Sequence, residues 1–270
     1  MSNLSQGWIY QPVNAPMAPM RLFCFHYGGG SAQIFHKWGA MLAPVAEVCA
    51  VQLPGRSSRL REKPFSCMEP LIEELLPIVN KHLDRPYALL GLSLGALIAF
   101  ELARKLRRQG ALLPTALFTV SRLAPQLKRE GSTMLGHSDT ECLKILEERY
   151  GPAPGSELMK DPHMRALVMP GLLADIAIFE NYEYSSGDPF SFPVIALRGK
   201  ADPATTEDEN KAWGVHSPTR FISHDFPGGH FFWQEGEGDL VQYVSGRLSE
   251  CSGGHFRRET SSAAMENSPI

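Results

Sequence analysis

The stretch Gly91-Leu92-Ser93-Leu94-Gly95 decides the fold of this chain because of the residues on either side of it. An apolar, strand-like run at 87–90 precedes it, and a helix-like run at 96–103 follows. When a strand turns sharply into a helix, a serine at the apex is held above the end of the sheet, and small neighbours let the backbone bend there. The pattern therefore predicts a nucleophilic serine at position 93.

Short apolar segments alternate with segments of helical period along the rest of the chain. The expected strands are 21–25, 47–53, 87–91, 115–120, 194–198 and 220–226, and the expected helices are 32–42, 68–83, 94–109, 205–213 and 239–248. This alternation is typical of a mostly parallel sheet with helices on both faces. Together with the serine turn, it predicts an α/β-hydrolase fold of the α/β class, in a single domain over 1–250.

The interval 123–184 breaks the alternation, because it shows only helical pattern, at 139–150 and 161–182, around a Gly/Pro-rich break at 151–155. It lies between two expected strands. We therefore predict a helical lid over the carboxyl edge of the sheet, with extra scaffold as the alternative. The tail 251–270 is polar and rich in Ser and Gly, so we expect it to be disordered and to lie outside the domain.

Composition excludes some classes of protein. A formal net charge of -3 with 20% charged residues gives no support for nucleic-acid or membrane-surface binding. The five cysteines include no C-x-x-C pair, and no signal peptide is visible, which favours a cytoplasmic location. The longest apolar stretch, at about 88–100, is too short to span a bilayer. The sequence is compatible with a monomer.

A serine hydroxyl is a poor nucleophile at neutral pH, so it needs a base, an acid that orients the base, and donors for an oxyanion. In α/β-hydrolases the triad follows the chain order Ser, Asp or Glu, His, with each residue after a strand. His230 is the candidate base because it follows the last expected strand through a Pro-Gly-Gly turn. The competitors are His216, which precedes that strand, and His224, which lies within it.

Asp202 is the candidate acid, since it comes shortly after the expected strand 194–198. Its alternative role is to cap the next helix, because Asp before Pro is a common helix start. Asp208 lies within that helix and Asp225 at the end of a strand, so both are less well placed to meet His230.

The oxyanion donors should be the backbone N–H of Leu94 and one N–H from the glycine-rich loop 26–31. Gly28 is the preferred donor in that loop, with Tyr27 and Gly29 left open. The loop lacks the G-x-G-x-x-G pattern, which disfavours dinucleotide binding.

These segments together resemble the type II (external) thioesterases of nonribosomal peptide and polyketide synthesis. The resemblance runs in order from Arg21 to Leu248 and is carried by 21–31, 52–56 with Arg59 and 62–64, 121–125, 170–175 and 228–232. It implies a triad of Ser93, Asp202 and His230, and hydrolysis of acyl groups from the phosphopantetheine arm of an acyl or peptidyl carrier protein. It also implies that no metal or redox cofactor is required.

Two departures from the family pattern stand out. Leu92 and Leu94 replace the usual His and Met beside the nucleophile, and His26 and Gly28 stand where Pro and Ala are commoner. Leu94 contributes only its backbone, so the oxyanion donor should be kept. Leu92 removes a polar side chain, which bears on rate or loop packing and not on the mechanism.

The same residues are compatible with other functions. The alternatives are a medium-chain fatty acyl thioesterase and a carboxylester hydrolase acting on free small molecules. A non-catalytic hydrolase-fold binding module is disfavoured because all three triad candidates are present. Carrier proteins are typically acidic, and the expected basic docking face is Arg56, Arg59, Arg61 and Lys63. A second basic group, at 104–108, lies at a helix end, where cations complement the macrodipole.

The expected lid is rich in apolar side chains that could line an acyl channel or pack its helices together. They are Leu143, Leu158, Met159, Met164, Leu167, Met169, Ile176 and Ile178.

Overall fold

The computed structural model describes residues 7–128 and 133–252, which form a seven-stranded sheet in the order β1-β3-β2-β4-β5-β6-β7. The short β1 is antiparallel to β3, and all other neighbouring strands are parallel. The strands are β1 (Ile9–Tyr10), β2 (Arg21–Phe25), β3 (Glu47–Val51), β4 (Tyr87–Leu92), β5 (Leu117–Val120), β6 (Val194–Gly199) and β7 (Ile222–Phe226). All six predicted strands are present, and β1 was missed because two residues carry no readable period.

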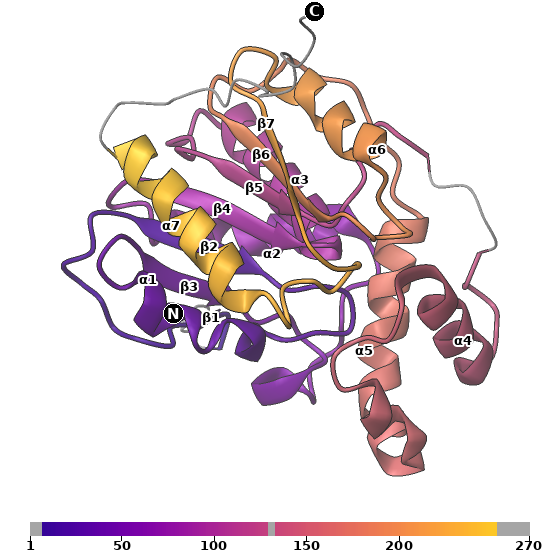
Figure 1. The fold of residues 1–270 in the computed structure, drawn as a ribbon. Coiled ribbons are helices and arrows are strands. Elements are labelled where there is room, and N and C mark those ends of the chain that lie inside the picture. The colour runs from indigo at the N-terminus through magenta and orange to yellow at the C-terminus, as the bar shows by residue number, and fades with distance from the viewer. Residues whose placement is uncertain (1–6, 129–132, 253–270) are drawn as a thin grey trace, which may run out of the picture.

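Helices cover both faces of the sheet (Figure 1). On one face α1 (Trp38–Leu42) and α7 (Glu237–Ser252) pack over a core that includes Leu90 and Leu92 of β4. On the other face α2 (Met68–Asn80) and α3 (Leu94–Arg108) pack over a core that includes Leu89. Because both faces are buried, the strands read as continuous apolar runs, as in other helix-covered parallel sheets. Leu92 therefore packs in the core, where a polar side chain would lose its hydration.

Several predicted helices differ from the structure in detail. The segment 32–42 divides into a 3₁₀ turn, η1 (Ala32–Phe35), and α1. The segment 205–213 likewise divides into α6 (Glu207–Lys211) and η4 (Ala212–His216), and a further turn, η2 (Ser57–Arg59), follows β3. Helix α7 continues to Ser252, so the predicted tail begins later than residue 251; its remainder, 253–270, lies outside the described residues.

The described residues between β5 and β6 contain no strand and form α4 (Asp139–Tyr150), η3 (Ser156–Lys160) and α5 (Pro162–Glu180). Ser138 begins α4 with a capping box, and Asp161 caps α5 through two backbone N–H groups. Helix α5, with α4 beside it, stands at one end of the strands in Figure 1. By length and hydropathy alone α5 would suit a membrane span, but many apolar helices of globular proteins meet the same criteria.

Candidate active site

Ser93 occupies the sharp turn between β4 and α3, with φ 50° and ψ -109°. Positive φ is costly for a residue with a side chain and persists only where the surroundings enforce it. Both flanking glycines are required there. A Cβ on Gly91 would lie 2.1 Å from the carbonyl carbon of Gly95, and a Cβ on Gly95 would lie 2.2 Å from the Phe25 carbonyl oxygen. Only glycine at these two positions therefore allows α3 to approach β4 and β2 this closely.

His230 and Asp202 meet Ser93 in a hydrogen-bonded chain. His230 Nε2 lies 3.1 Å from Ser93 Oγ, and His230 Nδ1 lies 2.9 Å from Asp202 Oδ2. The histidine and the aspartate are buried, at 3% and 5% exposed. A carboxylate at Nδ1 favours the tautomer with the proton on that nitrogen. Nε2 is then the acceptor that faces the serine hydroxyl, which is the arrangement a general base needs.

The loops after β6 and β7 bring the acid and the base together by packing on each other. The Lys200 N–H donates to the Phe226 carbonyl at 2.8 Å, and the Ala201 N–H donates to the Gly228 carbonyl at 2.9 Å. The contact is so close that a Cβ on Gly199 would lie 2.2 Å from the Gly229 carbonyl oxygen. The Asp loop and the His loop therefore form one unit.

Asp202 is not the cap of the following helix, so that alternative is wrong. Its Oδ1 accepts a hydrogen bond from the Ala204 N–H at 2.8 Å, which fixes its own turn. Thr206 caps α6 instead, with a capping box. The other candidate acids lie elsewhere: Asp208 is exposed in the first turn of α6, and Asp225 pairs with an arginine of β6 at 2.7 Å.

The two competing histidines, His224 and His216, contact residues other than Ser93. His224 stacks on Tyr243, with ring centroids 4.4 Å apart. His216 is 2.7 Å from Gln126 Oε1 and packs edge-on against Phe100. The structure thus brings His230, and neither competitor, to Ser93.

Two buried histidines predict how stability depends on pH. Burial and a nearby arginine lower the pKa of His26 and of His216 to about 4, below the ordinary histidine value of 6.5. The unfolded chain therefore binds more protons between pH 6.5 and 4, and stability is lost as the pH falls through that window. We expect urea denaturation to show a lower free energy of unfolding at pH 5 than at pH 7.5, with a shallower dependence in His216→Gln. An equal dependence in that variant would contradict the assignment.

The two residues that carry the candidate oxyanion donors, Gly28 and Leu94, lie close together. Leu94 is the first residue of α3, so its N–H has no partner within the helix and sits at the positive end of the helix dipole. A Cβ on Gly28 would be 3.9 Å from Leu94 Cδ2. The Gly29 N–H, an alternative donor, instead donates to Asp175 Oδ2 at 2.7 Å, which favours Gly28 over Gly29. The choice of Gly28 and Leu94 remains a prediction.

A cavity of about 460 Å³ opens over Ser93 and His230 and is covered by α4, η3 and α5. Four of the predicted lid side chains line it: Leu143, Leu158, Met159 and Ile176. Others serve packing instead, since Met169 lies in a small lid core and Ile178 in the main core. Tyr150 is the last residue of α4, and the centroid of its ring lies 4.6 Å from the centroid of the His230 ring. The insertion therefore contacts the proposed base directly.

The predicted basic docking face is wrong for two of its four residues. Arg56 and Arg59 are each only 8% exposed. Arg56 pairs with Asp175 at 2.5 Å, and Arg59 pairs with a neighbouring glutamate. Buried guanidinium groups need such partners, so they cannot present a charged surface. Arg61 and Lys63 remain exposed.

Sequence reasoning gave Asp175 no role, although it lies within the apolar run 171–178 of α5. A single carboxylate in such a run is the signal that could have marked it, because a buried charge needs partners.

The serine turn, the hydrogen-bonded His-Asp pair and the covered cavity at the carboxyl edge of a parallel sheet define the chain as an α/β-hydrolase with serine-hydrolase geometry. A family model for the thioesterase domain matches residues 20–247. The chain belongs to the thioesterase family, as a type II thioesterase of nonribosomal peptide and polyketide biosynthesis. Type II thioesterases act on carrier-protein-bound acyl groups of synthetase pathways.

Individual relatives cover nearly the whole chain. Linear gramicidin dehydrogenase LgrE of Brevibacillus parabrevis is 36% identical over 89% of this chain and 92% of its own length. Gramicidin S biosynthesis protein GrsT of Aneurinibacillus migulanus is 31% identical, over 92% and 96%. The solved type II thioesterase BorB from the borrelidin biosynthetic cluster has a TM-score of 0.78 at 34% identity, over 92% and 98%. The name of LgrE describes a dehydrogenase, whereas the family model that this chain matches describes a thioesterase.

Proposed function

We propose that this chain hydrolyses acyl groups from the phosphopantetheine arm of carrier proteins, with Ser93 as nucleophile, His230 as base and Asp202 as orienting acid. The observation that carries the proposal is the hydrogen-bonded chain of 3.1 and 2.9 Å through these side chains. The similarity to GrsT and BorB supports a role in a biosynthetic pathway. A cytoplasmic location belongs to the same proposal.

The geometry supports a two-step reaction. His230 Nε2 takes the proton of Ser93 as Oγ attacks the thioester carbonyl carbon, and the N–H groups of Gly28 and Leu94 receive the oxyanion. The C–S bond then breaks, and His230 gives its proton to the departing sulfur. In the second step His230 takes a proton from water, whose oxygen attacks the acyl carbon of the acyl-enzyme. The bond from that carbon to Ser93 Oγ then breaks, and His230 returns the proton to Oγ as the acid is released. Asp202 holds Nδ1–H and stabilises the imidazolium in both steps. Neither step requires a metal or redox cofactor.

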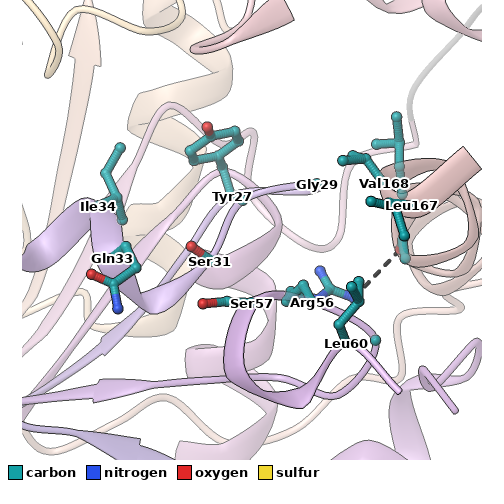
Figure 2. A pocket seen from close by; sticks show the side chains of 14 residues that line it. Tyr27, Gly29, Ser31, Gln33, Ile34, Arg56, Ser57, Leu60, Leu167 and Val168 are labelled. Carbon is teal, nitrogen blue, oxygen red and sulfur yellow. Dashed lines mark hydrogen bonds between the residues drawn. The ribbon is translucent and has the colours of Figure 1, made fainter. Parts of the chain in front are cut away.

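Two adjoining cavities support a division of the substrate between acyl chain and arm. The lid cavity, with its apolar side chains, suits the acyl chain. A second cavity of about 500 Å³ shares Tyr27 and Gly29 with the first and is lined by Ser31, Gln33 and Leu167 among others. Figure 2 shows it between the loop after β2 and α5. Its hydroxyl and amide groups suit a pantetheine arm, which carries amides and a hydroxyl. The exposed Arg61 follows Leu60, which also lines this cavity.

The proposal predicts that the wild-type chain prefers a carrier-bound substrate. We expect kcat/KM for an acyl-carrier thioester to exceed that for the same acyl group on CoA or on p-nitrophenol by about tenfold or more, because contacts remote from the reacting bond contribute binding energy. A preference for CoA would favour a fatty acyl thioesterase, and a preference for the ester would favour a carboxylester hydrolase. A chain that binds without turnover would be a binding module.

A matched pair of variants tests the division of the substrate in the same assay. Leu167 is 47% exposed at the second cavity, and Leu158 is 56% exposed at the lid cavity. Leu167→Trp should raise KM for the carrier and CoA thioesters and leave the p-nitrophenyl ester unchanged. Leu158→Trp should raise KM for substrates with long acyl chains, whichever leaving group they carry. If Leu167→Trp changes ester and thioesters alike, the arm does not lie in the second cavity.

A further inference from the structure

A buried ion pair joins α5 to the loop beside the proposed nucleophile. Asp175 is 1% exposed, and its Oδ2 accepts hydrogen bonds from the Gly29 N–H at 2.7 Å and from Arg56 Nη1 at 2.5 Å. Arg56 also donates to the Pro54 carbonyl at 3.2 Å and to the Gly171 carbonyl at 3.4 Å. In Figure 2 Arg56 lies below Gly29, on the loop beside Ser57, and the dashed line to the helix marks the last of these bonds.

These contacts tie together three segments that lie far apart in the sequence: the loop after β2, the loop after β3, and α5 of the lid. Helix α5 approaches the second loop closely, since a Cβ on Gly171 would lie 3.0 Å from the Gly55 carbonyl oxygen. A side chain at that position would require the loop to shift by a few tenths of an ångström. The lid is therefore anchored at the edge of the oxyanion loop.

The anchor lies next to the candidate oxyanion donor. Gly29 directly follows Gly28, whose hypothetical Cβ would be 3.8 Å from Asp175 Cβ. Glycines have wide backbone freedom, so holding the Gly29 N–H restricts how the neighbouring peptide can rotate. A bare carboxylate this close would also repel a developing oxyanion. The guanidinium of Arg56 offsets that charge, which lets Asp175 hold the loop without opposing catalysis.

We infer that Asp175 is a positioning residue that aims the Gly28 N–H at the oxyanion through its bond to Gly29, and that it makes a competent oxyanion hole depend on α5 being docked. The inference rests on the proposed function, because it needs Ser93 to form a tetrahedral intermediate. Asp175 itself touches neither the reacting atoms nor the triad in this role. We therefore expect its effect to fall on the transition state more than on substrate binding.

Asp175→Asn tests the inference, because asparagine keeps the shape but loses the charge that holds Arg56. We expect kcat for the acyl-carrier thioester to fall about 10- to 100-fold, which does not exceed the cost of losing an oxyanion donor outright. KM should change less than about threefold. The rate of inactivation by a fluorophosphonate, whose phosphoryl oxygen occupies the oxyanion hole, should fall in step with kcat. A role confined to folding would not move that rate in the folded protein.

Asp161→Asn is the matched control, because Asp161 is exposed at the start of the same helix, where it caps the backbone. Asparagine caps equally well, so kcat should stay within about twofold of wild type. The inference would be overturned if Asp175→Asn kept the wild-type kcat and inactivation rate, or if its only change were in KM. An equal loss of kcat in Asp161→Asn would overturn it as well. If Asp175→Asn does not fold, Arg56→Gln is the second variant. It removes the cation that neutralises Asp175, so the bare carboxylate should oppose the oxyanion and lower kcat with little change in KM. A wild-type kcat in Arg56→Gln would overturn the inference equally. Activity in Ser93→Ala would instead show that the proposed function has failed.

Discussion

Replacing Ser93 by alanine is expected to lower kcat for an acyl-carrier thioester by about 10³-fold or more, with little change in stability. Removal of a triad member leaves only the catalysis that the oxyanion hole and substrate binding provide. His230→Gln should cost a comparable factor, since Nε2 lies 3.1 Å from the serine Oγ and is the proposed acceptor of its proton. Initial rates on the carrier substrate, with fluorophosphonate labelling of the serine, measure both effects.

The two losses should not add, because the serine and the histidine act as one unit. We expect the double variant Ser93→Ala/His230→Gln to be about as inactive as either single variant. His224→Gln is the control, since that ring stacks on Tyr243 and not on the triad. Near wild-type turnover by Ser93→Ala, or a large loss in His224→Gln, would contradict the assigned triad.

The second large effect is expected on stability, from Gly95→Ala. The new Cβ would lie 2.2 Å from the Phe25 carbonyl oxygen and 2.7 Å from that of His26. Both are backbone atoms at the end of β2, so no side chain can turn aside to relieve the overlap. We expect the free energy of unfolding to fall by about 3 kcal/mol or more, at or beyond the upper range for overpacked sites. Chemical denaturation, or the yield of folded protein, measures the loss.

Gly246→Ala provides the comparison for that substitution. Gly246 lies inside α7, and among the described residues no atom beyond the helix's own backbone is within 4 Å of the position that its Cβ would take. Alanine is the better helix former, so we expect this variant to gain about 0.5–1 kcal/mol. If Gly95→Ala unfolds like wild type, the close approach of α3 to β2 does not exist in solution.

The parallel sheet and the residues of the proposed triad were predictable from the sequence because each depends on local signals. Strands buried on both faces read as apolar runs, and the Ser93 turn needs glycines within two residues of it. His230 and Asp202 each follow such a strand, and the carboxyl ends of parallel strands meet at one edge of the sheet. Strand β1 gave no comparable signal, because two residues cannot establish a period.

The roles of the charged residues were decided only by the tertiary structure. From the sequence, Arg56 and Arg59 were indistinguishable from the exposed Arg61, because all follow the same strand. Burial separates them, and the carboxylate that pairs with Arg56 lies 119 residues further along the chain. A buried guanidinium requires a partner, but which one it finds depends on how α5 packs over the loops. Local pattern thus determines where the nucleophile stands in this protein, and long-range packing decides which charges are structural, since only the folded chain removes them from water.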